Sequence, residues 1–190
     1  MTTRTLRTVI CSAATFLAAG VVPMAVIAQQ PRTVVLGLSG GASLPNGDLA
    51  IKASSGFNVN LHLFVSSHDI KKNLSFRGDL NYDRWKGKPV LPGTLRSIAG
   101  FANGLYTLGG RNLSYRPYVV AGAGFSNIQR TLNACNGTCE ISDTKPAVQG
   151  GVGIQFYLRN FQTFIEGRYV NVFGDNGSTR WIPVSFGFHF

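Results

Sequence analysis

Charged residues are scarce in this chain, and acidic ones are the scarcest. Asp, Glu, Lys and Arg make up 14% of the 190 residues, with 18 basic and 8 acidic side chains and a net charge of +10. A positive balance is one feature of nucleic-acid-binding proteins. The basic residues are scattered, however, and no run of five gathers them. Attraction to anionic lipid headgroups therefore accounts for the charge better than a nucleic-acid partner does.

Recognisable catalytic and metal-binding motifs are also missing. The sequence contains no phosphate-binding loop, zinc signature or dinucleotide fingerprint, so no cofactor is expected. Beyond residue 28 no apolar run is long enough for a membrane-spanning helix, and there is no repeat of the solenoid kind. What remains is a chain with abundant glycine and frequent aromatic residues.

Residues 1–28 have the composition of a secretory signal peptide. Two arginines and no acidic residue precede an apolar run over about residues 9–22, and the segment ends at a small residue, Ala28. An uncleaved anchor helix is the alternative, since about 20 apolar residues can span a bilayer. Pro23 and the small residues near Ala28 favour cleavage after Ala28. Residues 29–190 are then expected to form one domain.

The exported part of the chain alternates between strand patterns and turn residues. Strands of roughly ten residues have the length that crosses a bilayer at a tilt. The eight expected strands are 33–43, 56–66, 73–84, 94–108, 115–128, 146–158, 161–173 and 180–190.

The expected connections alternate in length. Long ones follow the first, third, fifth and seventh strands, at 44–55, 85–93, 129–145 and 174–179. The connections after the second, fourth and sixth strands are shorter. Bacterial outer-membrane barrels have short periplasmic turns and longer outer loops, and an even strand count places both termini on the periplasmic side.

The closing segment has the strongest alternation of apolar residues. In a strand, side chains two residues apart share a face, and the residues that do so here are Ile182, Val184, Phe186, Phe188 and Phe190. In a soluble protein this face and its unpaired edge would promote aggregation. The pattern is instead consistent with a strand whose apolar face contacts lipid and which closes a barrel against the first strand.

A soluble barrel with an apolar cavity would alternate in the same way. The apolar face that continues to Phe190, the loop asymmetry and aromatics near strand ends favour the membrane alternative, because aromatic girdles lie at those ends. The expected girdle residues are Tyr82, Trp85, Tyr106, Tyr118, Tyr157 and Trp181.

Five charged residues are expected inside the barrel. Arg77, Asp79 and Asp83 share one strand face, and Glu166 and Arg168 share another. A Lys or Arg on the lipid face costs about 2–4 kcal/mol at the midplane, and an eight-stranded interior is just wide enough to be filled by side chains. We expect a static ion-pair network, in preference to a gate or proton relay. Its expected polar neighbours are Asn58, Asn60, Gln149 and Gln155.

Four segments carry a resemblance to known proteins: Gly37–Ser43 with Pro45–Asp48, Arg116–Gly124, Phe164–Tyr169, and Ile182–Phe190. They resemble strands of a family, the OmpA/OmpX-type barrels of Gram-negative outer membranes. The resemblance implies an all-β fold, an eight-stranded antiparallel transmembrane up-and-down β-barrel. In that family the outer-membrane assembly machinery recognises the terminal aromatic residue and its alternating apolar partners. The apolar residues of the closing segment fit that insertion signal.

Cys135 and Cys139 lie in the expected loop 129–145. An exported protein meets an oxidising compartment, so a disulfide between them is expected. A metal or redox site is the alternative, but no His or second Cys pair accompanies them.

The sequence therefore predicts a protein of the bacterial outer membrane with a structural or surface-interaction role, such as adhesion or envelope integrity. A narrow porin-like channel for small polar solutes or ions is the alternative. A lipid A-modifying enzyme is less favoured, because none of His62, His68 and His189 lies at the expected outer rim. Expected partners are outer-membrane lipids and lipopolysaccharide, and the barrel-assembly machinery and periplasmic chaperones during biogenesis. No motif identifies a ligand of the outer loops.

Overall fold

The computed structural model describes residues 34–65, 73–89, 93–108, 115–135, 137–158, 161–175 and 177–190. Residues 1–28 lie outside these ranges, so the signal peptide and its cleavage stay predictions. Within the described ranges, no helix combines the length and hydropathy that a membrane-spanning helix needs.

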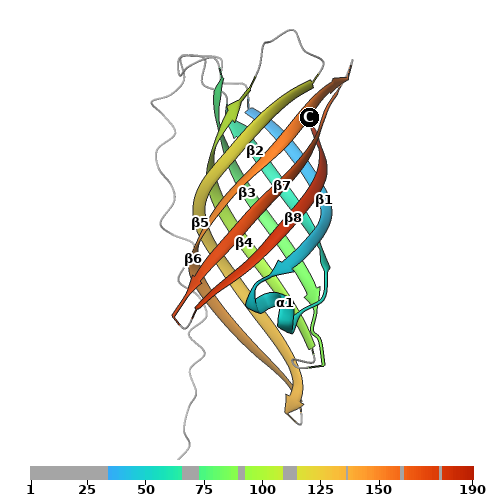
Figure 1. Ribbon diagram of the computed structural model, residues 1–190, viewed down its shortest axis with the longest axis vertical. Helices are drawn as coiled ribbons and strands as arrows, with labels where there is room; N and C mark the ends of the chain where they lie inside the picture. The colour runs from blue at the N-terminus through green and yellow to red at the C-terminus, as the bar shows by residue number, and fades with distance from the viewer. Residues whose placement is uncertain are drawn as a thin grey trace, which may run out of the picture. The chain divides into compact units, whose positions relative to one another are not determined.

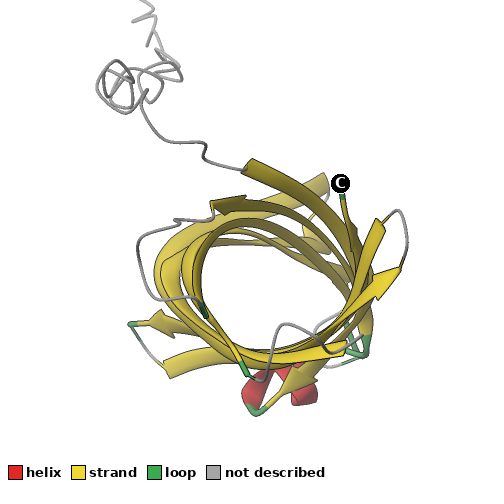
Figure 2. Ribbon diagram, turned by 90° about the horizontal axis from the view of Figure 1, so that it is seen from above, coloured by secondary structure: helices red, strands yellow, loops and turns green. Residues whose placement is uncertain are grey.

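The described chain forms a closed barrel of eight strands (Figures 1 and 2). Each strand pairs antiparallel with the next, and β8 pairs with β1 to complete the ring. This confirms the predicted eight-stranded antiparallel up-and-down fold. The strands are β1 (Val34–Asn46), β2 (Gly56–Val65), β3 (Leu74–Lys86), β4 (Gly93–Thr107), β5 (Tyr115–Cys135), β6 (Gly137–Leu158), β7 (Phe161–Gly174) and β8 (Gly177–His189).

The two ends of the barrel differ. The start of β1 and the last residue lie at one end, where the Phe190 amide donates to the Leu36 carbonyl at 2.8 Å; we call this the terminal end. The opposite end carries a short helix, α1 (Asp48–Lys52), and we call it the α1 end (Figure 1).

The predicted loop asymmetry is wrong at the α1 end. The expected loop 129–145 is instead a continuation of β5 and β6, which stay paired through Leu132 and Cys139 and pair again at Cys135 and Gly137. The β7–β8 connection is also tight, because Gly174 pairs directly with Gly177, whose φ of 135° suits glycine. The strands lengthen where long loops were expected. The sequence of β5 and β6 over 129–145 is mostly polar, so backbone pairing extends these two strands without any alternation in hydropathy.

The expected loop 44–55 is largely ordered by α1. The helix is tied to the end of β3 through backbone hydrogen bonds, from the Lys88 amide to the Lys52 carbonyl at 2.8 Å and from the Ser54 amide to the Lys86 carbonyl at 2.9 Å. The Lys88 ammonium also donates to the Ala50 carbonyl at 2.6 Å. The helix therefore folds back onto the barrel.

The two cysteines lie at the tip of the β5–β6 hairpin. Cys135 ends β5, and Cys139 lies opposite Leu132 in β6. The side chains of residues 132–140 lie outside those that the structure describes, and the disulfide stays a prediction.

Candidate functional site

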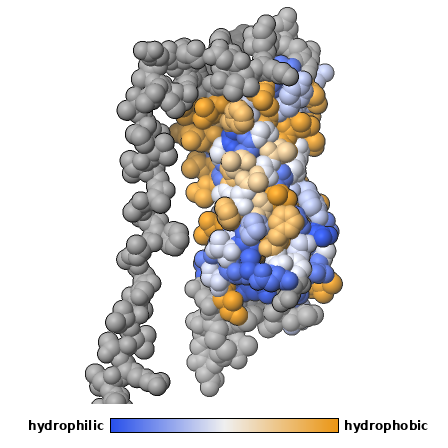
Figure 3. All heavy atoms as spheres, turned by 90° about the vertical axis from the view of Figure 1, so that its left-hand side faces the viewer, coloured by the Kyte–Doolittle hydropathy of each residue, from blue (hydrophilic) through white to orange (hydrophobic). Residues whose placement is uncertain are grey.

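Alternation along the strands places apolar side chains outside the barrel and polar ones inside. Leu61 and Phe186 leave 48% and 47% of their surface exposed, whereas Arg77 and Arg168 leave 2% each. This is the reverse of a water-soluble barrel with an apolar cavity. In Figure 3, hydrophobic residues cover much of the upper part of the visible wall, and hydrophilic residues concentrate toward the lower, α1 end.

Four charged residues form the centre of the lumen. Arg77 of β3 reaches Glu166 of β7 with two parallel contacts, Nη1 to Oε2 at 2.7 Å and Nη2 to Oε1 at 2.8 Å. The same guanidinium lies 2.7 Å from Asp79 through Nε. Arg168 lies 3.2 Å from Glu166 and 3.4 Å from Asp79. Two cations thus balance two anions, which is the condition under which buried charges are tolerated.

Neutral side chains from other strands complete this network. The Tyr118 hydroxyl of β5 donates to Glu166 at 2.6 Å. Asn103 of β4 donates to Asp79 at 3.0 Å, and Gln149 of β6 donates to the side-chain oxygen Oδ1 of Asn103 at 2.6 Å. The two carboxylates therefore accept hydrogen bonds from several sides of the barrel.

The remaining predicted lumen residues are placed differently. Asp83 is buried but outside the central quartet, and the Ser43 hydroxyl donates to it at 2.7 Å. Asn58 and Asn60 lie together, joined by a 2.9 Å hydrogen bond. Gln155 does not join the network: it is half-buried, and its side chain oxygen accepts from the Tyr157 hydroxyl at 3.3 Å.

A Ser–His–Asp arrangement shares Asp79 with the central charges, and sequence reasoning missed it. Ser39 Oγ lies 2.9 Å from His62 Nε2, and His62 Nδ1 lies 2.8 Å from Asp79 Oδ1. The connectivity is that of a hydrolase triad. However, Ser39 is 4% exposed and His62 is 0% exposed, so no substrate carbonyl could approach Oγ in this conformation. Ser39, His62 and Asp79 lie on the adjacent strands β1, β2 and β3, and all three side chains face the lumen. The two-residue alternation of these strands was the sequence signal that could have placed them on one inward face.

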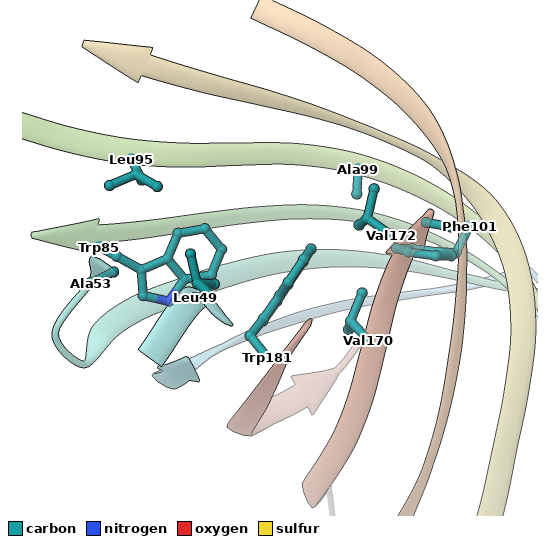
Figure 4. Close-up of a cluster of buried hydrophobic side chains, with 10 residues drawn as sticks. Leu49, Ala53, Trp85, Leu95, Ala99, Phe101, Val170, Val172 and Trp181 are labelled. Atoms are coloured by element: carbon teal, nitrogen blue, oxygen red, sulfur yellow. The ribbon is translucent and has the colours of Figure 1, made fainter. Parts of the chain in front are cut away.

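An apolar layer closes the lumen at the α1 end. Trp85 and Trp181 pack edge to face, with ring centroids 5.2 Å apart, and Leu49 and Ala53 from the α1 segment lie beside them (Figure 4). The expectation of a lipid-facing girdle is therefore wrong for these tryptophans: Trp85 and Trp181 are 2% and 1% exposed and face the interior. Tyr118 also faces inward. Each of these aromatic residues lies an even number of positions from lumen-facing residues of its own strand. The alternation of side chains therefore turns it inward, although it is near a strand end.

An aromatic layer fills the lumen toward the terminal end. The His189 ring stacks on Phe164 with centroids 4.6 Å apart and meets Phe64 edge-on at 4.4 Å. The Arg77 guanidinium lies 5.5 Å from the Phe64 centroid, within cation–π distance. The polar centre is thus covered by packed side chains at both of its ends.

A shallow cavity of about 360 Å³ opens at the α1 end, between α1 and the ends of β5 to β8. Lys145 bridges across its edge to Asp175 at 2.6 Å, and this hydrogen bond raises the pKa of Lys145. Because the charges of the cavity balance, they favour neither anions nor cations. The charged lining residues are Asp48, Lys52, Arg130, Asp143, Lys145 and Asp175.

Among the described residues, no group of three or more His, Cys, Asp or Glu could hold a metal ion. The side chains of Cys135 and Cys139, to which the metal alternative applied, lie outside them. The apolar residues of the closing strand are placed on its outward face. Val184, Phe186 and Phe188 are 39–47% exposed, and Phe190 is 77% exposed.

No family model matches the chain, and no curated protein matches its sequence. Solved structures of small outer-membrane barrels do match its fold. Neisserial surface protein A aligns with 84% of this chain and 98% of its own, at 14% identity and a TM-score of 0.64. OprG of Pseudomonas aeruginosa aligns with 84% of this chain and 97% of its own, at 13% identity and a TM-score of 0.53. The outer-membrane enzyme PagL aligns with 83% and 99%, at 17% identity and a TM-score of 0.52. The chain therefore has the fold of the small eight-stranded outer-membrane barrels.

Proposed function

We propose that this protein is an integral protein of the bacterial outer membrane with a structural or surface-interaction role. The observation that carries the proposal is the inverted distribution of polarity, with apolar side chains on the outer wall and a balanced charge network inside. A wall of this kind is stable when lipid, and not water, surrounds it. Lipopolysaccharide and the other outer-membrane lipids are then its immediate partners.

The proposed orientation puts the terminal end in the periplasm and the α1 end outside the cell. An even-stranded barrel has both termini on one side, and in bacterial outer-membrane barrels that side is periplasmic. The outward apolar residues of β8, together with Phe190 that follows the strand, are proposed as the signal for the barrel-assembly machinery. Adhesion or envelope integrity would then depend on α1 and the long β5–β6 hairpin.

The packed lumen favours this role over the alternative of a narrow channel. Ions would have to displace the Trp85–Trp181 pair, the central ion pairs and the Phe164–His189 stack in turn. An enzymatic role has less support, because the Ser39 hydroxyl is buried in the lumen and inaccessible to a substrate. The fold itself is compatible with enzymes and with non-enzymatic proteins.

Membrane insertion is tested by refolding the protein into phospholipid vesicles. The folded barrel should migrate differently on gels before and after boiling and should require detergent for extraction. Identical migration in both states, together with extraction into buffer, would overturn the proposal.

The filled lumen is tested separately in planar bilayers. We expect no steady unitary current from the purified protein at voltages where a porin control conducts. Reproducible unitary currents would contradict the filled lumen and would support the channel as the function.

A further inference from the structure

The cavity between α1 and the ends of β5 to β8, which we call the α1-end cavity, combines an apolar floor with charged walls. Ile128 and Val172 form the floor. Val172 belongs to the apolar layer that contains Trp85 and Trp181, and Ile128 packs against it (Figure 4). The cavity volume of about 360 Å³ is within the range of small-molecule sites, about 300–1,000 Å³. A small molecule could enter from the α1 end, but the apolar layer would stop it there.

Arg130 of β5 is the cation of this cavity that is best placed to bind a ligand. It is half-buried, and no other side chain in the described part of the chain forms a hydrogen bond or an ion pair with its guanidinium. Its direct cross-strand partners are apolar, Leu95 of β4 and Ile141 of β6. The guanidinium can therefore donate to an anionic group that enters the cavity.

A carboxylate lies close to Arg130 on the same wall of the cavity. Asp143 follows Ile141 by two residues in β6, so Arg130 and Asp143 are diagonal neighbours across the β5–β6 ladder. Such neighbours lie about 7–8 Å apart.

Asp143 remains able to accept hydrogen bonds from a ligand. Its side chain is 62% exposed, and its contact with Lys145 is long, at 3.7 Å. Lys145 makes its shorter contact with Asp175, at 2.6 Å.

A cation and an anion at this separation match the two charged groups of a free α-amino acid. The carboxylate and the ammonium group of such a ligand are attached to one carbon atom, so both groups fit between a guanidinium and a carboxylate of the protein. The lining of the cavity contains three cationic and three anionic side chains. A lining without net charge favours a ligand without net charge over a simple anion or cation.

We propose that the α1-end cavity binds an α-amino acid with an aliphatic side chain. The ligand carboxylate accepts two parallel hydrogen bonds from Arg130, the geometry that a guanidinium favours. The ligand ammonium group donates to Asp143, and the aliphatic side chain packs on Ile128 and Val172, where its burial is favourable. The binding site goes beyond the structural role proposed above and does not depend on which side of a membrane the cavity faces.

The test measures binding of L-leucine to the folded protein in detergent micelles by ligand-observed NMR titration. We expect saturable binding to the wild type. Binding to Arg130→Gln and to Asp143→Asn should be at least about tenfold weaker, because each variant loses charge-assisted hydrogen bonds. The matched controls Lys52→Gln and Asp48→Asn remove the same charges from the α1 side of the same cavity and should stay within about twofold of wild type.

Three related ligands identify the group that each part of the site binds. L-Leucinamide lacks the carboxylate, so it should bind wild type and Arg130→Gln equally. N-Acetyl-L-leucine lacks the ammonium group, so it should bind wild type and Asp143→Asn equally. Glycine, which has no side chain for the apolar floor, should bind wild type more weakly than L-leucine does. Equal losses of L-leucine binding in all four variants would overturn the site in favour of general attraction by charge.

The boiled and unboiled gel mobilities of each protein separate this proposal from membrane insertion. A wild-type protein that folds into vesicles but shows no saturable binding of L-leucine would overturn the amino-acid site alone. A protein that does not fold into vesicles would overturn membrane insertion. Uptake of L-leucine into vesicles through the folded barrel would contradict the closed floor and with it the proposed site.

Discussion

Replacing Glu166 by Gln removes one negative charge from the centre of the lumen while keeping the size of the side chain. In the native structure the carboxylate accepts from Arg77 at 2.7 and 2.8 Å and from Tyr118 at 2.6 Å, and it lies 3.2 Å from Arg168. The amide group that replaces one oxygen can only donate, so it would face donors. The lumen would also carry one uncompensated positive charge.

The expected loss is large because all of these groups are buried. Hydrogen bonds to charged groups contribute about 1.5–3 kcal/mol each, and breaking a buried ion pair by removing one partner costs about 3–5 kcal/mol. We therefore expect Glu166→Gln to lower the free energy of unfolding by about 3–5 kcal/mol. Arg77→Met should cost a similar amount, because it leaves Glu166 and Asp79 with Arg168 as their shared cation.

The double variant Arg77→Met/Glu166→Gln restores a balanced lumen, in which Asp79 keeps Arg168. Its loss should be smaller than the sum of the two single losses by about 1–3 kcal/mol, the coupling expected for residues in contact. The measurement is a urea titration in phospholipid vesicles, with the folded fraction read from gel mobility and tryptophan fluorescence. Single losses that add to within about 0.5 kcal/mol would refute the coupling.

Asp175→Asn is the matched control for this series. Asp175 also forms a short ion pair, 2.6 Å from Lys145, but its side chain is 82% exposed. Water and salt screen an exposed pair, so its removal should leave the urea midpoint unchanged. A loss as large as that of Glu166→Gln would mean that burial is not the cause of the effect.

Three further predictions concern packing and access. Trp181→Ala should cost about 3–5 kcal/mol in the same titration, because it empties the layer that closes the α1 end; an unchanged midpoint would contradict that packing. Gly153→Ala should be destabilising, since its Cβ would overlap the Tyr118 ring, whereas Gly100→Ala, with nothing within 4 Å of its Cβ, should be tolerated. Ser39 should resist labelling by a fluorophosphonate in the folded barrel, with a known serine hydrolase as positive control; stoichiometric labelling that Ser39→Ala abolishes would revive the hydrolase.

The positions of the strands could be read from the sequence wherever one face is apolar. The predicted strand 56–66 corresponds to β2 at Gly56–Val65, and 161–173 corresponds to β7 at Phe161–Gly174. The prediction failed at the α1-end parts of β5 and β6, where the sequence is mostly polar. There the strands are extended by backbone hydrogen bonds alone. Backbone hydrogen bonds do not require apolar and polar residues to alternate, so the sequence shows no strand pattern.

The two tryptophans show a case in which two sequence signals, the alternation of side chains and the distance from the strand end, gave opposite predictions. Trp85 shares the parity of Asp79 and Asp83, and Trp181 shares that of Ser185. Parity places all of them inside the barrel, and the structure agrees with parity. Their position near strand ends suggested a lipid-facing girdle instead. In a strand, the alternation of side chains decides the facing more strictly than the distance from the end does.

The sequence by itself determined the class of fold and, where apolar and polar residues alternate clearly, the outward apolar face of a strand, because a two-residue period is a local property of the chain. The facing of the Gly- and Ala-rich strands β4 and β5 was not determined in this way. The tertiary structure alone decided which lumen groups meet. Arg77 and Glu166 are 89 positions apart, and their contact depends on the register of every strand pair and on closure of β8 against β1. The same closure brings Ser39 to His62, and folds Leu49 of α1 against the layer that contains Trp85 and Trp181. Register and closure are non-local, so the alternation could place charges in the lumen but could not pair them.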